Sequence, residues 1–284
     1  MAQDAPREAD HGDRFVRLDD GDMHVVEDGP PDAPALLLIH GSAASTVCWD
    51  RVMPRLAGSY RVIRVDLLGH GKSSSPAAGY DVGTQARRVA AALDRIGAGR
   101  VTVIGHSTGA TVAIALAERR PGLVTALALI DMGPSPDAKI PERALVRLLL
   151  TPFPGRLLWQ LKTEDTIRKA GRTGFTRPVD IPDAMIQDVL GMTYRAFTQT
   201  LRAPVDYLGQ RSLPDRLTEL GLPVLVIFGT DDRRWRSSSA AAYRAVPGAR
   251  VELLPGVGHT PIMEDPQTTA ALLREFADAT AHQA

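Results

Sequence analysis

The chain has 284 residues and a balanced charge, with 33 Lys and Arg against 33 Asp and Glu. A balanced total gives no electrostatic footprint for a nucleic acid or for an anionic membrane, so we expect neither partner. The one cysteine, Cys48, excludes an internal disulfide and fits a reducing compartment. No apolar run approaches the roughly 20 residues of a membrane span, and residues 1–13 lack the apolar region of a secretory signal. We therefore expect a disordered leader and a cytoplasmic protein.

The predicted elements begin with a hairpin. Residues 15–17 and 23–26, separated by Asp-Asp-Gly-Asp, indicate two short strands added to one edge of a sheet. Six apolar runs follow, and they are continuous rather than alternating, as expected for parallel strands buried on both faces. These runs are residues 36–40, 61–66, 101–105, 124–131, 223–229 and 249–256.

Helix-like stretches lie between several of these runs, at residues 80–96, 107–119, 237–246 and 266–279. Strand followed by helix, repeated along a chain, indicates a parallel sheet that helices cover on both sides. The sequence therefore predicts an α/β fold with a mostly parallel eight-stranded sheet.

Residues 134–213 break this rhythm. They contain helical patterns punctuated by proline and no buried strand, and they are too long for a loop in a compact domain. We predict a helical cap or lid over 134–213, inserted into a core made of 14–133 and 214–284. The sequence leaves open which apolar residues of the cap line a pocket.

Ser107 stands at the sharpest transition of the chain. The run VTVIG stops at Gly105-His106-Ser107-Thr108-Gly109, and a small-residue helix follows. The two glycines leave room for a tight strand-to-helix turn that lifts the serine side chain. The helix that starts there aims free N–H groups, Thr108 first, toward a developing negative charge.

Other polar residues follow other predicted strands. Ser42 comes after Gly41, Asp231 and Asp232 follow the run that ends at Gly229, and His259 lies in a glycine-containing loop before the last helix. Sites in parallel sheets gather at the carboxyl ends of strands, so these groups are expected to meet. Nucleophile, base, acid and oxyanion donors are the parts that attack on a carbonyl requires.

These motifs resemble the α/β-hydrolase superfamily over about residues 14 to 280. Residues 105–109 resemble its nucleophile elbow, 40–42 its oxyanion loop, 66–73 its D-x-x-G-x-G-x-S segment, 229–232 its acid turn and 258–259 its histidine loop. The sequence GHSTG is similar to the elbows of esterases and of cofactor-free haloperoxidases. Residues 134–213 occupy the position of the family's cap.

The resemblance implies a Ser107, His259 and Asp232 triad, with the backbone N–H groups of Ser42 and Thr108 as oxyanion donors. Asp232 is the fourth residue of the G-x-x-D pattern, ahead of Asp131, the alternative acid that ends an earlier strand. The acid turn continues Arg-Arg-Trp-Arg, where many relatives have a proline. No metal and no organic cofactor is required. Three histidines stand next to a glycine at a predicted strand end, and we interpret them as structural: His40, His70 and His106.

The function that follows is a serine hydrolase that cleaves a small-molecule carboxylic ester, lactone or thioester through an acyl-enzyme. Serine instead of aspartate at the elbow argues against dehalogenase or epoxide hydrolase chemistry. Two alternatives stay open. One is a tailoring enzyme of natural-product metabolism (a perhydrolase, C–C hydrolase, lyase or acyl cyclase), and the other is a ligand receptor with a closing cap. A nucleotide-binding loop at 69–73 is rejected because the P-loop pattern needs glycine where the chain has Asp66.

Overall fold

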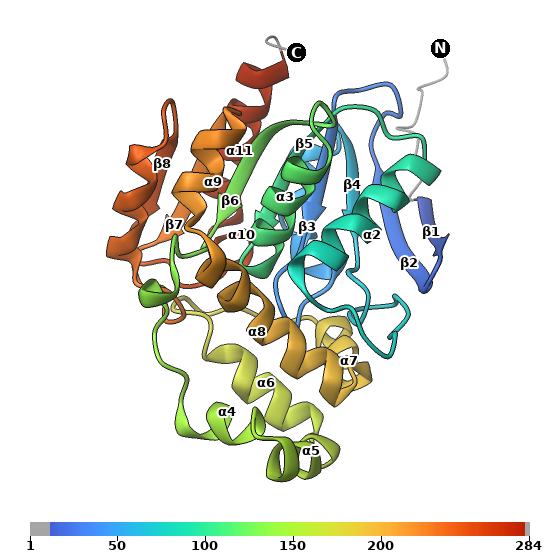
Figure 1. Ribbon diagram of the computed structural model, residues 1–284, viewed down its shortest axis with the longest axis vertical. Helices are drawn as coiled ribbons and strands as arrows, with labels where there is room; N and C mark the ends of the chain where they lie inside the picture. The colour runs from blue at the N-terminus through green and yellow to red at the C-terminus, as the bar shows by residue number, and fades with distance from the viewer. Residues whose placement is uncertain (1–11, 282–284) are drawn as a thin grey trace, which may run out of the picture.

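An eight-stranded sheet forms the centre of the computed structural model, which describes residues 12–281 (Figure 1). Its strands lie in the order β1-β2-β4-β3-β5-β6-β7-β8. Of the expected leader, residues 1–11 lie outside the described residues, while Gly12 and Asp13 belong to the first strand. The strands are β1 (Gly12–Leu18), β2 (Gly21–Asp28), β3 (Ala35–Ile39), β4 (Arg61–Val65), β5 (Val101–His106), β6 (Val124–Ile130), β7 (Val224–Gly229) and β8 (Arg250–Leu254).

The direction of the strands follows the sequence pattern. β1 and β2 form the predicted antiparallel hairpin, with Phe15 opposite His24, and β2 also runs antiparallel to β4. From β4 to β8 every neighbouring pair is parallel. All six residues of β5 and of β7 are buried, as a strand covered on both faces requires. The predicted mostly parallel α/β sheet is confirmed.

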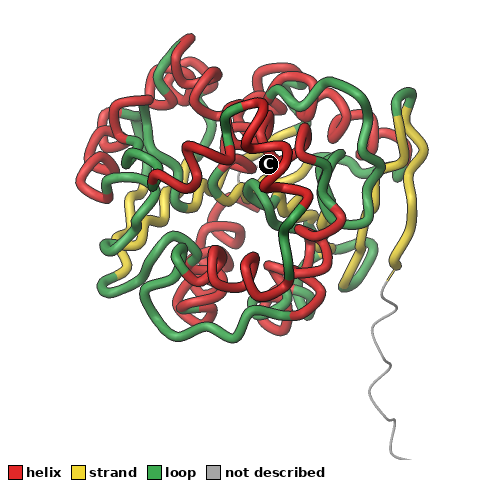
Figure 2. The backbone as a smooth tube through the Cα atoms, turned by 90° about the horizontal axis from the view of Figure 1, so that it is seen from below, coloured by secondary structure: helices red, strands yellow, loops and turns green. Residues whose placement is uncertain are grey.

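Helices cover both faces of the sheet (Figure 2). Leu37 and Ile39 of β3 pack into one apolar cluster with α2 and α3, whereas Leu36 and Leu38 pack into a second cluster with α1 and α11. Successive side chains of a strand point to opposite faces, so a continuous apolar run supplies both clusters. The α-helices that flank the sheet are α1 (Met53–Leu56), α2 (Val82–Arg95), α3 (Thr108–Arg119), α9 (Leu213–Leu220), α10 (Pro261–Glu264) and α11 (Pro266–Ala281).

Short 3₁₀ helices lie in the connections between these elements. The segment expected to be helical at 237–246 is a 3₁₀ helix rather than an α-helix. The 3₁₀ helices are η1 (Thr46–Trp49), η2 (Pro136–Ala138) and η3 (Ser237–Ala245).

The connection from β6 to β7 carries the helices that gather at one end of the molecule (Figure 1). They lie beyond the carboxyl ends of the strands, and hydrogen-bonding caps define some of them. Thr193, for example, accepts a hydrogen bond from the N–H of Ala196 at the start of the longest of them. These helices are α4 (Ala144–Leu149), α5 (Pro152–Gln160), α6 (Glu164–Arg172), α7 (Asp183–Gly191) and α8 (Tyr194–Gln210). The division into a core and a cap stays a prediction.

Across residues 12–281, none of the helices combines the length and the apolar character needed to cross a bilayer.

His24 ties the N-terminal hairpin to the segment that follows β4. Its Nδ1 lies 2.7 Å from Asp66 Oδ2, and its Nε2 lies 2.5 Å from Asp13 Oδ1. Asp66 also accepts hydrogen bonds from the N–H groups of Thr46 and Lys72. Burial works to lower the pKa of His24, but the bonds and charges of Asp66 and Asp13 outweigh it and raise the pKa. His24 therefore joins the hairpin to the loop of Asp66.

Replacing His24 with glutamine is expected to destabilise the protein more at low pH than at high pH. A histidine whose pKa is higher in the folded state contributes stability that is complete below its unfolded pKa of about 6.5. That contribution is lost as the pH rises through the folded value. Urea unfolding at pH values of about 6 and about 9 measures the effect. A stability difference that stays constant over this range would contradict the charged bridge.

Candidate active site

Ser107 occupies a strained turn between β5 and α3. Its backbone has φ 51° and ψ −121°, a conformation that residues with a side chain rarely adopt. The N–H of Ser107 donates to the carbonyl of Ile130 over 2.8 Å, which fixes the turn to β6. A Cβ on Gly105 would lie 2.5 Å from the backbone of Ala110, and one on Gly109 would lie 2.1 Å from the Ile39 carbonyl oxygen. The helix approaches the sheet this closely only because both positions are glycine.

The imidazole of His259 bridges Ser107 and Asp232. Its Nε2 lies 3.0 Å from the Ser107 Oγ, and its Nδ1 lies 2.9 Å from the Asp232 Oδ2. Asp232 Oδ1 accepts hydrogen bonds from the N–H groups of Arg234 at 2.6 Å and Trp235 at 3.3 Å. The Arg-Arg-Trp-Arg turn, which lacks the proline of many relatives, thus orients the carboxylate through its own backbone. The structure brings the three residues of the predicted triad together, and their catalytic roles stay a prediction.

Glu264 holds the loop of His259, and the sequence analysis missed it. Its Oε2 accepts from the N–H groups of Thr176, Arg177 and Gly258, at 2.8, 2.9 and 3.0 Å. The N–H of His259 donates to the carbonyl of Gly174 over 3.0 Å. A glutamate in the first turn of α10 carries no motif, and two of its backbone partners, Thr176 and Arg177, come from a distant segment. No signal in the sequence could therefore have assigned it this role.

The two expected oxyanion donors lie next to each other. The Ser42 and Thr108 hydroxyl oxygens are 2.7 Å apart, and the Ser42 hydroxyl also donates to the Thr200 carbonyl of α8 over 3.0 Å. Thr108 is the first residue of α3, where backbone N–H groups have no partner within the helix. The hydroxyl contacts join the loop after β3, the elbow and α8. The role of Ser42 and Thr108 as oxyanion donors stays a prediction.

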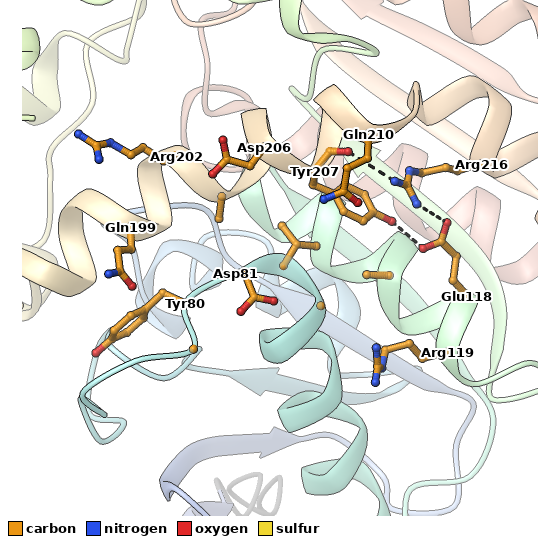
Figure 3. Close-up of a pocket in the computed structure, with 15 residues that line it drawn as sticks. Tyr80, Asp81, Glu118, Arg119, Gln199, Arg202, Asp206, Tyr207, Gln210 and Arg216 are labelled. Carbon is orange, nitrogen blue, oxygen red and sulfur yellow. Dashed lines mark hydrogen bonds and ion pairs between the residues drawn. The ribbon is translucent and has the colours of Figure 1, made fainter.

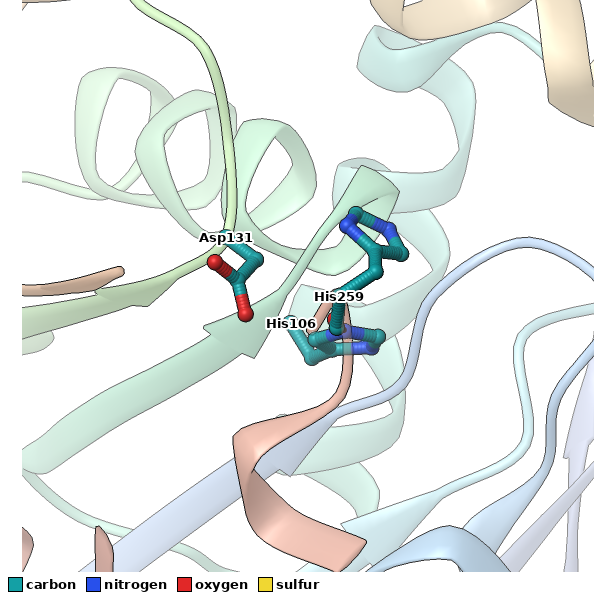
Figure 4. Close-up of side chains that lie close together, drawn as sticks. All are labelled: His106, Asp131 and His259. Atoms are coloured by element: carbon teal, nitrogen blue, oxygen red, sulfur yellow. The ribbon is translucent and has the colours of Figure 1, made fainter. Parts of the chain in front are cut away.

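Asp131, the alternative acid, is fully buried but does not pair with His259 (Figure 4). Its Oδ1 accepts from the N–H of Gly229 over 2.8 Å, while its Oδ2 has no hydrogen-bond partner in the described part of the chain. Burial, reinforced by the negative charge of Asp232, raises the pKa of the Asp131 carboxyl well above its usual range. The carboxyl that contacts the imidazole is that of Asp232.

His106, Asp131 and His259 are the residues closest to a metal-ligand arrangement. They offer ligand atoms within 4.8 Å of one another. However, both ring nitrogens of His259 already face Ser107 and Asp232, and His106 Nε2 donates to the His259 carbonyl over 2.7 Å. An ion held by all three side chains would take His259 away from one of its two partners. Burial, aided by the nearby His259, lowers the pKa of His106 to about 3, so this histidine stays neutral. It supports the loop, as a structural histidine would.

His40 has a similar structural place. Its Nδ1–H donates to the carbonyl of Gly41 over 2.7 Å, and its Nε2 accepts from the N–H of Leu67 over 3.0 Å. The ring of His70 lies 4.9 Å from that of His40. These contacts hold the loop that leads to Ser42.

A cleft lies away from the triad, between α8, α3 and the loop at residues 79–83 (Figure 3). Its volume is about 610 Å³, and neither Ser107 nor His259 lines it. Three basic and three acidic side chains face it, and Tyr207 and Arg216 both bind Glu118 in its wall at 2.8 Å. The cleft therefore has no net preference for one sign of charge. The charged residues are Asp81, Glu118, Arg119, Arg202, Asp206 and Arg216.

Comparisons with known proteins agree with this architecture. A model of the alpha/beta hydrolase family matches residues 36–272. An uncharacterized protein of Mycobacterium tuberculosis is 35% identical over 264 residues, which cover 87% of this chain and 76% of that protein. The pimeloyl-(acyl-carrier protein) methyl ester esterase of Neisseria meningitidis is 29% identical over 255 residues, covering 87% of this chain and 78% of the esterase.

Among solved structures, the chain is similar to a membrane phospholipase A described as a bacterial virulence factor. The TM-score is 0.76 at 29% sequence identity, and the match covers 95% of this chain and 87% of that one.

The mostly parallel sheet, its flanking helices and the strained serine turn define the α/β-hydrolase fold. Since the family model covers most of the chain, the protein belongs to the alpha/beta hydrolase family. The predicted resemblance is confirmed. Membership supports an α/β-hydrolase enzyme with esterase homologues.

The Asp131→Asn variant is expected to gain stability relative to the wild type as the pH rises. A carboxyl whose pKa is raised by folding contributes stability that is complete below its unfolded pKa of about 3.9 and is lost as the pH rises. Asparagine keeps the oxygen that accepts from Gly229 and has no charge to bury. Each unit by which the pKa is raised corresponds to about 1.4 kcal/mol. Urea unfolding at pH values of about 4 and about 8 measures the trend, and a pH-independent difference would contradict it.

Proposed function

We propose that the protein is a serine hydrolase that cleaves a carboxylic ester or a related acyl compound, such as a lactone or thioester. The observation that carries this proposal is the His259 imidazole, which lies 3.0 Å from the Ser107 hydroxyl and 2.9 Å from the Asp232 carboxylate. A serine attacks a carbonyl only when a base removes its proton and another group orients that base. The same three side chains supply both functions.

The first half of the reaction acylates Ser107. His259 Nε2 takes the proton of the Ser107 hydroxyl while Oγ attacks the acyl carbon. The carbonyl oxygen becomes an oxyanion, which accepts hydrogen bonds from the backbone N–H groups of Ser42 and Thr108. His259 then gives its proton to the oxygen or sulfur of the leaving group, and the tetrahedral intermediate collapses to an acyl-enzyme.

The second half releases the acid. Water donates a proton to His259 and attacks the acyl carbon, the oxyanion forms again in the same place, and the proton returns to the Ser107 oxygen. Asp232 holds the Nδ1–H tautomer of His259 and stabilises the imidazolium at each step. Its two backbone hydrogen bonds orient the carboxylate for that role.

The substrate class follows from the nucleophile and from the relatives. A serine at the elbow forms an acyl ester and is regenerated by water, whereas alkyl-halide chemistry needs a carboxylate there. The similar proteins include a methyl ester esterase and a phospholipase A, and both names denote cleavage of carboxylic esters. These likenesses support an acyl ester substrate.

Ser107 is expected to react covalently with a fluorophosphonate probe, since a base lies within hydrogen-bond distance of its hydroxyl. Intact-mass and peptide mass spectrometry would locate the adduct. The Ser107→Ala variant should not label and should lose about 10⁴-fold or more in kcat on any ester that the wild type cleaves. A matched Ser45→Ala variant, which changes a buried serine in the loop after β3, should still label. Labelling of Ser107→Ala at the wild-type rate would refute the nucleophile.

Asp232→Asn should lower kcat by about 10⁴-fold, because asparagine favours the wrong tautomer of His259. Asp131→Asn should cost far less, because the Asp131 carboxyl accepts from Gly229 and does not contact the imidazole. Nitrophenyl ester hydrolysis measured on both variants distinguishes the two acids. The reverse order of the two losses would assign the acid to β6 instead of the turn after β7.

A further inference from the structure

The outer surface of α4 and α5 exposes large apolar side chains. Leu145 and Leu148 are 64% and 43% exposed, Phe153 and Leu157 are 85% and 55% exposed, and Leu161 is 66% exposed. These residues are the α4–α5 patch. Exposed leucines occur singly on any surface, but five large apolar side chains on two adjoining helices need an explanation.

The spacing places these residues on single helix faces. Leu145 and Leu148 are three residues apart on α4, and Phe153, Leu157 and Leu161 follow one another at four-residue intervals along and just past α5. Side chains three and four residues apart lie on the same side of a helix. The two helices pack against each other at the end of the molecule farthest from the sheet (Figure 1).

The fold does not need this outward face, because α5 is anchored by its inner side. Trp159 is buried, its ring stacks on Phe197 with centroids 4.1 Å apart, and its Nε1–H donates to the Met192 carbonyl over 3.0 Å. Tyr194 donates to the carbonyl of Leu149 at the end of α4. Helix α5 therefore has apolar side chains on two sides: Trp159 is buried, whereas Phe153 and Leu157 are exposed.

The stretch that carries the patch is basic. Residues 143–163 contain three arginines, one lysine and no acidic residue, and Glu142 and Glu164 border this stretch at its two ends. Arg143, Arg147 and Arg156 are exposed, and the structure gives their side chains no hydrogen bond or ion pair among residues 12–281. Lys162 lies over the Trp159 ring, 4.7 Å from its centroid. Apolar side chains bordered by unpaired cations match a surface with anionic headgroups above acyl chains.

We propose that the α4–α5 patch docks the protein on a phospholipid bilayer that contains anionic lipids. Phe153, Leu157 and the leucines enter the boundary between headgroups and acyl chains, and the three arginines bind phosphate groups. A second copy of the chain fits less well, because a symmetric contact would bring the same arginines of both copies together. This inference does not rest on the proposed hydrolase function, since docking requires no turnover.

The proposal differs from the first expectation about partners, which stays a prediction. The balanced charge of 33 against 33 predicted no membrane partner. That sum averages over the whole chain, whereas attraction to a surface depends on the charge of the face presented to it.

Flotation of the purified full chain with vesicles tests the proposal. Vesicles of phosphatidylcholine with added phosphatidylglycerol should carry the wild type, and pure phosphatidylcholine vesicles should carry much less. The double variant Phe153→Ser and Leu157→Ser should lower the partition coefficient about tenfold for each residue. The double variant Arg147→Gln and Arg156→Gln should lower it about fivefold for each residue on the anionic vesicles.

Matched controls separate the patch from general effects. Leu253→Ser removes a 42%-exposed leucine on β8, and the pair Arg55→Gln and Arg244→Gln removes two exposed arginines elsewhere. Both controls should bind like the wild type. All variants should keep the wild-type melting temperature and Ser107 labelling, because the altered side chains are exposed and far from the triad.

Three results would overturn the proposal. The wild type could fail to float with anionic vesicles. The Phe153→Ser and Leu157→Ser variant could float as well as Leu253→Ser, which would show that charge alone attracts the protein to the vesicles. Alternatively, sedimentation could show a dimer that the Phe153→Ser and Leu157→Ser variant dissociates, which would assign the patch to a second copy. A loss of Ser107 labelling in the wild type would refute the hydrolase and leave this test unaffected.

Discussion

The close approach of α3 to the sheet at Gly109 is the constraint on which the site depends. A Cβ at this position would lie 2.1 Å from the Ile39 carbonyl oxygen, and one on Gly105 would meet the backbone of Ala110 at 2.5 Å. Because both side chains are absent, the helix begins directly over the end of β3, and Ser107 is held at φ 51°. The strain at this one residue is sustained by a fully buried strand before it and a buried helix after it. The serine hydroxyl is thereby raised beside His259, and the first N–H of α3 lies beside the loop of Ser42.

The site is assembled from two segments within the β6–β7 connection as well as from the sheet. The Ser42 hydroxyl donates to Thr200 of α8, and the His259 N–H donates to Gly174, which follows α6. Glu264 binds N–H groups from that same segment and from the histidine loop. The helices beyond the sheet therefore help to fix the geometry of the triad. Helices α4 and α5 of the same connection expose apolar and basic side chains, so the β6–β7 connection contributes to both proposals.

Much of the fold was predictable from local patterns. Strands such as β5 and β7 are continuous apolar runs with turn residues at each end, and this pattern has few alternatives in a chain that alternates with helices. The β1–β2 hairpin and the helical connections between parallel strands were predictable for the same reason. Residues 237–246 form a 3₁₀ helix, because local propensity does not decide between helix types in a short Ser- and Ala-rich stretch. Residues 12 and 13 pair with β2, although their own composition indicates no strand.

The sequence by itself determined the strained elbow, because Gly105 and Gly109 around Ser107 are a local requirement of one tight turn. It also determined that Ser42, Asp232 and His259 follow strand ends, where parallel strands bring side chains to one edge. Which of Asp131 and Asp232 contacts His259 is visible in the tertiary structure alone. Both acids follow strands, and the contact with His259 depends on where the loops after β7 and β8 fold. The part played by Glu264 and the exposure of Phe153 were also decided there, because contact and burial are relations between distant segments, and these leave no mark on local spacing.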